Sequence, residues 1–387
     1  MDDQQTHFFD QRRSLLVVKK QVKGIGMKVK KKGLLVWAVA FLMALSTSAQ
    51  EAQQLLLKDF EPRSIFNIPV TEVTRARFPV IDVHAHQSAA RTEEEIGEWV
   101  KTMDRFGIRK TIILATTTGA AFDSICRLYA RYGDRFEVWC GFDYTGYDQP
   151  GYGPAAVKEL ERCYRAGARG VGELGDKGKG MFFSQPVKAW GMHCDDPRLK
   201  PLFEKCAELK MPVNIHIADP YWMYLPMDRH NDGLMNAAKW QIDSTRAGTI
   251  GFHALLRSLE NVVRENPKTT FIACHFANCN HDLELIARLL DLYPNLYLDN
   301  SARFALSGPI PRTMKKFYSR YAGRIMFGTD NGRSPDMYGI SFRILETTDE
   351  HFYYPGYLYH WSYSGLDLGN RILKRIYYKN AKRILHL

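Results

Sequence analysis

The sequence predicts an α/β protein: a (β/α)8 TIM barrel whose long loops lie over the C-terminal face of the strands. Three observations support this prediction, namely eight short β-branched runs, amphipathic helical stretches between them, and polar residues where the runs end. Strands that alternate with helices are typical of parallel sheets with helical crossovers, and eight such units close into a barrel. The alternative is an open doubly wound sheet, but no glycine-rich fingerprint follows the first run.

Each predicted strand is a short apolar run bounded by turn residues. The runs occupy residues 79–86, 110–118, 136–144, 168–175, 211–219, 269–276, 295–302 and 324–331. The stretches with helical spacing of apolar residues occupy 92–107, 120–135, 154–168, 197–210, 281–294 and 310–323. Two connections, 221–248 and 332 to about 365, are longer than ordinary loops, and we expect them to cover the active-site end of the barrel.

The first 49 residues read as a leader rather than as part of the barrel. A lysine cluster after Met27, an apolar run and small residues up to Ala49 are typical of a secretory signal peptide at 27–49. The apolar run is shorter than the roughly 20 residues of a membrane span, so a retained anchor is the weaker alternative. We therefore expect a secreted or periplasmic bacterial protein that meets the membrane only through a signal peptide that is then cleaved. Met27 is an alternative start to Met1.

The remaining chain divides into an N-terminal extension, residues 50–78, and a barrel domain, residues 79–387. The leader carries +6 of the formal net charge of +11, so the basic composition does not predict a nucleic-acid partner. The seven cysteines are an odd number without a CxxC pair, and we expect no disulfide framework. The expected partners are a small-molecule substrate and, as one option, further copies of the chain in a homo-oligomer.

Polar residues that can bind a metal end most of the predicted strands. They are His84 and His86 on the first strand, Glu173 on the fourth, His216 on the fifth, His275 on the sixth and Asp330 on the eighth. In a barrel of this kind, catalytic residues gather at the C-terminal ends of the strands. His84 and His86, two residues apart on one strand, point to the same side and can bind one ion.

Imidazole and carboxylate ligands together suit Zn²⁺ best, with Mn²⁺ or Fe²⁺ as alternatives. We expect His84, His86, His216 and Asp330 to form the site. Each residue also has an ordinary structural explanation: a histidine that ends a strand is often hydrogen-bonded in the core, and Asp330 could cap the next element. Glu173 could pair with Lys177 on a loop. It is the joint occurrence at strand ends that favours a metal site.

The same segments resemble a known family. DVHAH (82–86), NIHIAD (214–219), ACHFAN (273–278), FGTDNG (327–332) and the closing segment 365–385, with Asn380 before its last helix, are similar to the metal-dependent amidohydrolase superfamily. The likeness is greatest to the amidohydrolase 2 branch, which includes lactonases and non-oxidative decarboxylases. It implies a (β/α)8 barrel with the ligands named above around the metal, and His275 near the metal-bound water or the substrate.

One residue departs from the commonest pattern of that branch. Glu173 stands at strand four, as a similar glutamate does in TatD-like nucleases, where it helps to hold two metals. Such a carboxylate can bridge ions about 3.5 to 4 Å apart, so we expect one or two ions in the site. No lysine stands clearly at strand four to be carbamylated.

These residues predict a metal-dependent hydrolase that cleaves a C–O or C–N bond of a lactone, ester or amide with a metal-activated water. Asp330 would take the proton from that water, and His275 would orient or stabilise the oxyanion. Three alternatives stay open: a non-oxidative decarboxylase of the same superfamily, a TatD-like binuclear phosphodiesterase, and a secreted carbohydrate-binding barrel without catalysis.

The substrate is expected to be sugar-derived or aromatic. Two segments, 220–230 and 351–365, are rich in Tyr and Trp, and Tyr221 and Trp222 could stack on such rings, although these rings could also simply pack the loops onto the barrel. Arg303 and Lys177 lie near strand ends and could bind a substrate carboxylate.

Overall fold

The computed structural model describes residues 54–183, 187–354 and 359–387. The predicted leader and signal peptide lie outside the described residues. The chain divides into two compact units, Met1–Phe60 and Glu61–Leu387. The described part of the first unit contains one short 3-10 helix, η1 (Leu57–Asp59). Among the described residues, no helix is both long enough and apolar enough to cross a membrane.

The second unit contains the eight parallel strands that the sequence predicts. They are β1 (Val80–Ala85), β2 (Ile108–Leu114), β3 (Phe136–Trp139), β4 (Val171–Asp176), β7 (Val213–Ile217), β8 (Phe271–Ala273), β9 (Leu296–Asp299) and β10 (Ile325–Met326). Strands β1, β2 and β3 pair in that order, and a second sheet has the order β10-β9-β8-β7-β4, continued by a short hairpin of β5 (Gly180–Met181) and β6 (Ala189–Trp190).

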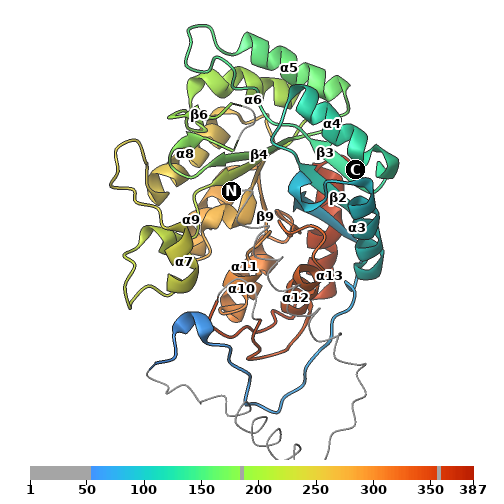
Figure 1. The fold of residues 1–387 in the computed structure, drawn as a ribbon, viewed down its shortest axis with the longest axis vertical. Helices are drawn as coiled ribbons and strands as arrows, with labels where there is room; N and C mark the ends of the chain where they lie inside the picture. The colour runs from blue at the N-terminus through green and yellow to red at the C-terminus, as the bar shows by residue number, and fades with distance from the viewer. Residues whose placement is uncertain (1–53, 184–186, 355–358) are drawn as a thin grey trace, which may run out of the picture. The chain divides into compact units, whose positions relative to one another are not determined.

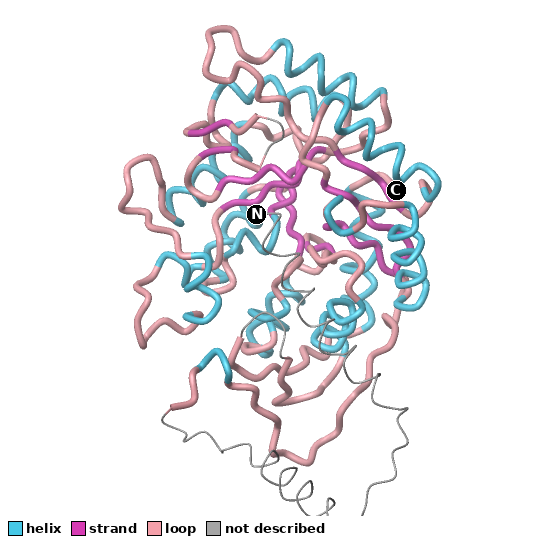
Figure 2. Tube along the Cα trace, viewed as in Figure 1, coloured by secondary structure: helices cyan, strands magenta, loops and turns pink. Residues whose placement is uncertain are grey.

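Backbone hydrogen bonds join the two sheets into one barrel. Cys140, directly after β3, forms a parallel bridge with Val171 of β4. On the other side, the N–H of Val83 in β1 donates to the carbonyl of Phe327 after β10 at 2.9 Å. The predicted (β/α)8 barrel is therefore confirmed, and Figures 1 and 2 show the strands grouped at the centre with helices around them.

The barrel interior is packed with apolar side chains rather than hollow. It is filled by Ile81, Val83, Ile112, Leu114, Trp139, Ile272 and Met326, and closed by Ala381 and Ile384 of the C-terminal helix and by Leu385 directly after it. That helix, α14 (Asn380–Ile384), lies at the N-terminal ends of the strands, where the Asn380 amide donates to the carbonyls of Ala322 and Ile325 at 2.7 Å each. The opposite, C-terminal end is left for the polar side chains.

Six of the outer helices follow the predicted apolar spacing, and the structure adds two that were not predicted, at 252–265 and 335–346. Together they are α3 (Glu93–Phe106), α4 (Gly119–Tyr129), α5 (Pro154–Arg165), α6 (Lys200–Glu208), α8 (Phe252–Glu265), α9 (Leu283–Leu292), α11 (Pro311–Arg320) and α12 (Pro335–Glu346). In α3, the Thr92 hydroxyl caps the first turn by accepting from the N–H of Glu95, and Gly107 ends the helix at φ 83°. Its buried face comprises Ile96, Trp99, Met103 and Phe106, and this spacing directs it at the barrel.

Short helical segments make up the remaining connections. They are η2 (Gln87–Ala89), η3 (Ala130–Tyr132), η4 (Pro197–Leu199), η5 (Tyr221–Tyr224), α7 (Leu234–Trp240), η6 (Cys274–Asn278), α10 (Phe304–Ser307), α13 (Asn370–Lys374) and a π-helical turn, η8 (Arg375–Lys379).

The prediction for residues 332–365 as a covering loop is wrong in part. Pro335–Glu346 form the barrel helix α12, whose Tyr338 ring packs on Phe106 of α3 with centroids 5.6 Å apart. Gly339 and the β-branched residues of this segment lower its helix propensity, but burial against α3 outweighs that preference. Helix α8 was likewise not among the predicted helices.

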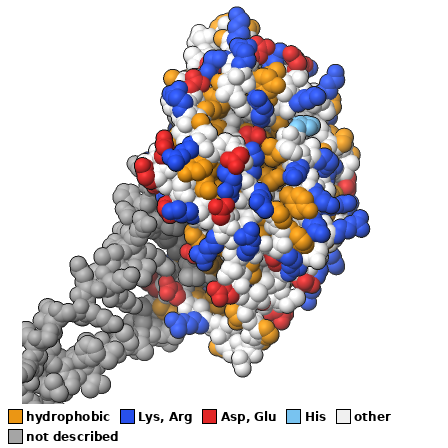
Figure 3. All heavy atoms as spheres, turned by 90° about the vertical axis from the view of Figure 1, so that its right-hand side faces the viewer, with side chains coloured by type: hydrophobic (Ala, Val, Ile, Leu, Met, Phe, Trp, Pro, Cys, Tyr) orange, Lys and Arg blue, Asp and Glu red, His pale blue; other side chains and the backbone are white. Residues whose placement is uncertain are grey.

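Charged side chains are interspersed on the surface. Figure 3 shows one face of the molecule, on which Lys and Arg side chains are frequent but alternate with Asp, Glu and apolar groups. On this face the Lys and Arg side chains are therefore scattered rather than gathered in one basic patch.

Candidate metal and active site

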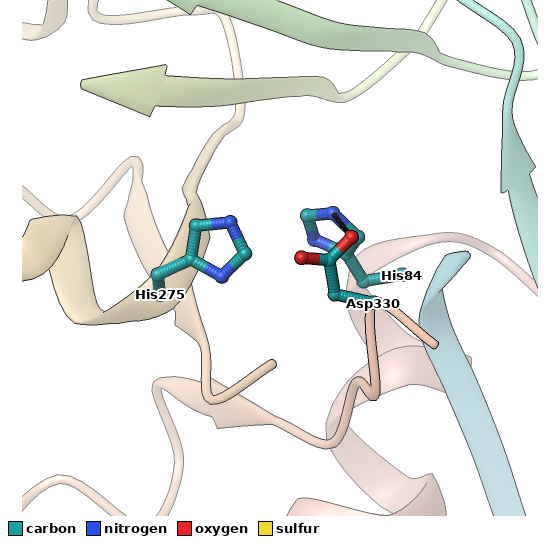
Figure 4. A group of neighbouring side chains, drawn as sticks. All are labelled: His84, His275 and Asp330. Atoms are coloured by element: carbon teal, nitrogen blue, oxygen red, sulfur yellow. Dashed lines mark ion pairs between the residues drawn. The ribbon is translucent and has the colours of Figure 1, made fainter. Parts of the chain in front are cut away.

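The strand-end residues of the sequence prediction meet at the C-terminal end of the barrel. Nε2 of His84 lies 3.6 Å from Oδ1 of Asp330, and Nε2 of His86 lies 3.2 Å from the same oxygen. The His275 ring lies 4.9 Å from the His84 ring, centroid to centroid. Figure 4 shows His84 and His275 with the Asp330 carboxylate next to the His84 ring.

Glu173 is the central carboxylate of this cluster. Its Oε1 lies 2.6 Å from Nδ1 of His216, 3.6 Å from Nε2 of His275 and 3.8 Å from Nε2 of His84. Its Oε2 lies 3.3 Å from Nε2 of His86. The structure therefore brings all six predicted residues together, and the prediction that Glu173 could pair with Lys177 is wrong, because the Lys177 ammonium lies 2.8 Å from Asp219.

Hydrogen bonds on the outer side of each ring determine which ring nitrogens carry protons. Nδ1 of His84 lies 2.9 Å from Oδ2 of Asp299, and Nδ1 of His86 lies 3.1 Å from the carbonyl of Leu114. Because a carbonyl or an ionised carboxylate only accepts, each Nδ1 carries a hydrogen, and Nε2 is the nitrogen that faces the cluster.

The other two rings have the same arrangement. Nε2 of His216 donates to the carbonyl of Ala218 at 2.8 Å, which leaves Nδ1 facing Glu173. Nδ1 of His275 donates to the carbonyl of Ser301 at 2.8 Å, which leaves Nε2 facing the centre. All four inward nitrogens thus face the two carboxylates, where they either carry a proton or offer a lone pair to a cation.

This arrangement fits a divalent cation. Nε2 of His84 is fully buried and has no hydrogen-bond partner among the described residues. Potential ligand atoms lie within 4.8 Å of one another in the sets His84, His275, Asp330; His84, His86, Glu173; and Glu173, His216, His275. Nitrogen and carboxylate donors of this kind suit Zn²⁺, Mn²⁺ or Fe²⁺, and imidazoles braced from behind are typical of metal ligands.

The ionisation states follow from burial and from the neighbouring charges. Burial would raise the pKa of Glu173, but the His216 ring holds it well below its usual range, and His86 similarly lowers the pKa of Asp330. Burial alone would lower the pKa of His84, yet Asp299 and the other carboxylates raise it to about 9. The cluster therefore favours added positive charge, which either protons or a cation can provide.

His275 differs from the other histidines. Burial, together with the nearby Arg303 guanidinium, lowers the pKa of His275 to about 4. The ring is neutral at pH 7, and its Nε2 accepts rather than donates. The oxyanion-stabilising role expected for His275 needs an N–H on this nitrogen, so the tautomer favours a role as ligand or proton acceptor instead.

A second layer of polar residues, absent from the sequence prediction, supports the cluster. The buried Asp299 carboxylate accepts from the His84 ring, from the backbone N–H groups of His275 and Ser301, from the Ser301 hydroxyl and from the amide of Asn214. The charge of His84 outweighs burial and lowers the pKa of Asp299 well below its ordinary value. Asp299 ends β9 in the same way that the predicted ligands end their strands, and this signal could have identified it.

Left-handed backbone recurs at this rim. Non-glycine residues with positive φ include Thr116 (57°), Ala218 (63°), Asp330 (62°) and the run His275–Asn278 (58°, 56°, 51° and 57°). This conformation costs about 1–2 kcal/mol for each L-residue, so the surrounding contacts must stabilise it. Such strain is often found where a backbone is bent to aim functional side chains.

The predicted substrate-binding residues fall into two groups. Arg303 is buried, with an exposed fraction of 8%. Its guanidinium donates to Asn278 and to the carbonyl of Ala302, and burial lowers its pKa. Among the described residues it forms no ion pair with a carboxylate, whereas Lys177 pairs with Asp219. Arg303 is therefore a buried cation beside the cluster with donors to spare.

The two aromatic candidates differ as well. Tyr221 stacks on His281, with centroids 4.3 Å apart and an interplanar angle of 9°. Trp222 packs against Trp361 and Tyr359, at 5.7 and 6.2 Å, and its indole N–H is buried without a partner among the described residues. Tyr359 in turn lies near the Arg303 charge, since the guanidinium contributes to the pKa of the phenol.

Comparison with known proteins adds a family and a fold. A family model described as Amidohydrolase matches residues 81–387. No curated protein sequence matches the chain. An uncharacterised TIM-barrel protein from Bordetella bronchiseptica is 16% identical, with a TM-score of 0.53 over 80% of this chain and 99% of that one.

Two further solved structures are similar. A candidate amidohydrolase from Staphylococcus aureus is 15% identical, with a TM-score of 0.50 over 80% of this chain and all of the other. A 2,6-dihydroxybenzoate decarboxylase from Rhizobium is 16% identical, with a TM-score of 0.47 over 80% and 99%. At these identities the likeness to solved structures concerns the fold alone. The family match covers the whole barrel with its cluster of histidines and carboxylates. The chain therefore belongs to the amidohydrolase family.

Proposed function

We propose that the protein is a metal-dependent hydrolase that cleaves a C–O or C–N bond of a lactone, ester or amide. The observation that carries the proposal is the outward hydrogen bonding of three buried imidazoles and of the half-buried His86, which turns one ring nitrogen of each toward Glu173 and Asp330. A purely structural network would pair these groups with donors, because unpaired buried polar atoms are costly.

The same groups suggest which residues hold the cation. The candidate ligand sets overlap: His84 and Asp330 group with His275, His84 and His86 with Glu173, and Glu173 with His216 and His275. This overlap supports one ion or two, with Zn²⁺ first and Mn²⁺ or Fe²⁺ as alternatives. When bound, such an ion acts as a Lewis acid that lowers the pKa of water and polarises a carbonyl.

Asp330 is the best candidate for moving the proton. Its carboxylate is ionised, and its side chain is 24% exposed, so it can reach both the attacking water and the leaving group. It would take the proton at a carboxylate oxygen and return it to the departing oxygen or nitrogen. His275, neutral and with its Nε2 lone pair inward, would serve as a ligand or a second acceptor.

Arg303 and Trp222 support a small substrate with an anionic group and a ring. Arg303 would bind the anion, because a buried guanidinium that has no ion pair within the described part of the chain gains most from a carboxylate. Trp222 would contact the ring and donate its unpaired indole N–H. Lys177 is already paired with Asp219, and Tyr221 is stacked on His281, so these two would have a structural role instead.

Non-oxidative decarboxylation is the second candidate, and Arg303 favours it, since a substrate carboxylate near the cluster is what that reaction requires. The two reactions differ in their products. On a panel of carboxylated lactones, esters, amides and hydroxybenzoates, hydrolysis releases acid without carbon dioxide, whereas decarboxylation releases carbon dioxide.

The proposal is tested first by metal analysis. The purified chain is expected to contain one or two divalent ions, and the double variant His84→Ala, His86→Ala is expected to contain none. A matched control, His253→Ala with His281→Ala, removes two histidines that pack on Tyr221 instead. Absence of stoichiometric metal in the wild-type chain would overturn the proposal, and two ions with phosphodiester cleavage would favour the phosphodiesterase.

We also propose that the chain is exported through a signal peptide at 27–49. The lysine cluster, apolar run and small residues support this. Expression in a bacterium with a cell envelope, fractionation and N-terminal sequencing should yield a mature chain beginning at Gln50; an uncut chain in the cytoplasm would contradict it.

A further inference from the structure

The side chain of Asn278 connects three strand ends of the cluster. It is buried, with an exposed fraction of 2%. Its amide nitrogen donates to the carbonyls of Ile217 at 3.0 Å and Ala218 at 3.1 Å. Its amide oxygen accepts from Nε of Arg303 at 3.0 Å and also from Nη2 of the same guanidinium. Both donors and the acceptor of the amide are in use, which aspartate or leucine could not reproduce.

These bonds reach both sides of the site. The Ala218 carbonyl that accepts from Asn278 also accepts the Nε2–H of His216, and so helps to hold Nδ1 of that ring toward Glu173. Arg303, the other partner, is the buried cation beside the cluster. The Asn278 amide therefore contacts both the carbonyl that supports His216, a candidate metal ligand, and Arg303, the candidate residue for binding the substrate anion.

Asn278 also ends the left-handed run that begins at His275. Four consecutive non-glycine residues with φ between 51° and 58° form this turn. At its start, the His275 N–H donates to Asp299 at 3.0 Å. At its end, the Asn278 amide bonds to β7 and to Arg303. Asparagine tolerates positive φ better than most residues, and here its side chain also anchors the strained segment.

We propose that Asn278 is a positioning residue. Through its hydrogen bonds it fixes the orientation of His216 and His275 on one side of the site and of Arg303 on the other. The inference rests on the proposed metal-dependent function and extends it to the residue that couples the metal-binding and substrate-binding parts. Loss of its N–H donors would let the Ala218 carbonyl and the His216 ring move. Loss of its oxygen would release Arg303.

The test uses Co²⁺ alone as the probe, since its visible absorption reports the number and geometry of its ligands. Asn278→Asp keeps an acceptor for Arg303 but removes both N–H donors. Asn380→Asp is the matched control: Asn380 is equally buried and also donates to two carbonyls, but at the opposite end of the barrel. Asn278→Gly removes the side chain and keeps a residue that accepts positive φ.

We expect the wild-type chain and Asn380→Asp to bind Co²⁺ with the same affinity and spectrum. Asn278→Asp and Asn278→Gly should bind it about 10- to 100-fold more weakly, with a shifted spectrum, as is usual when a supporting residue is lost. Folded Asn278 variants with wild-type affinity and spectrum would overturn this inference. So would variants that fail to fold, because Asn278 would then act on stability alone. A wild-type chain that binds no Co²⁺ would instead overturn the proposed function.

Discussion

The carboxylate of Asp299 lies 2.9 Å from Nδ1 of His84, while Nε2 of the same ring lies 3.6 Å from Asp330. One residue thus holds the ring from outside the cluster, and the other faces it from within. Asp299 fixes the tautomer of His84 and makes its inward nitrogen more basic. It also accepts the N–H of His275, so a single buried charge orients two strand ends.

Replacement of Asp299 by Asn should therefore weaken metal binding. The variant keeps the shape of the side chain but loses its charge, and we expect metal affinity to fall about 10- to 100-fold in a chelator competition assay. Asp349→Asn is a suitable control, because Asp349 is also buried and accepts from Thr71 and Arg343, away from the cluster. Equal metal affinities for both variants would contradict a supporting role for Asp299.

Stability should depend on pH through His193. Its Nδ1 lies 2.7 Å from the buried Asp176 carboxylate, and this hydrogen bond raises the pKa of His193 above its ordinary value of 6.5. The charged pair stabilises the folded chain by about 1 to 2 kcal/mol. Because the folded pKa is the higher one, this contribution is complete below pH 6.5 and is lost as the pH rises through the folded pKa.

Urea unfolding of wild type and His193→Gln between pH 5.5 and 9 measures this contribution. The difference in unfolding free energy should be largest at the acidic end and should shrink as the pH rises. A difference that stays constant, or grows toward alkaline pH, would mean that the pair does not titrate as described.

Ala277→Gly should stabilise the protein. Ala277 is buried at φ 51°, where an L-residue is strained by about 1–2 kcal/mol. Glycine relieves that strain, but it makes the unfolded chain more flexible, which lowers the free energy of unfolding by roughly 0.4–1 kcal/mol. We therefore expect a net increase in the free energy of unfolding of about 0.5 kcal/mol.

The control for this prediction is Ala287→Gly in the middle of α9, where the same substitution should cost about 1 kcal/mol. Opposite signs for the two variants in urea unfolding would support the strained turn. A destabilised Ala277→Gly would show that its contacts, rather than its backbone, dominate.

Arg303→Met should separate substrate binding from metal binding. We expect KM for an anionic substrate to rise about 100-fold, since a buried partner of the carboxylate is lost, while the metal content stays the same. The KM for a neutral ester of the same substrate should change little. Arg324→Met is the control, because Arg324 bonds to the carbonyls of Leu290 and Tyr293 at the other end of the barrel. Equal losses for the acid and its ester would argue against an anion site.

Much of the candidate site was accessible from the sequence. His84 and His86 share one face of a strand because the side-chain period of a strand is two, and barrel topology places Glu173, His216, His275 and Asp330 at the same end. Asp299 was missed although it ends its strand in the same way, because its partner, the His84 ring, is 215 residues away in sequence. Asn278 lies in the ACHFAN motif, but its role was not predicted, because its partners at Ile217, Ala218 and Arg303 are far away in sequence.

The sequence by itself determined the order of the eight strands, six of the helices between them, and the end of the barrel at which the polar residues meet, because local periodicity and strand direction are encoded residue by residue. Only the tertiary structure decided which nitrogen of each histidine faces inward, that Arg303 forms no ion pair among the described residues, and that Pro335–Glu346 form a helix. Those features depend on hydrogen bonds and burial between segments far apart in the chain, and no short stretch of sequence specifies them.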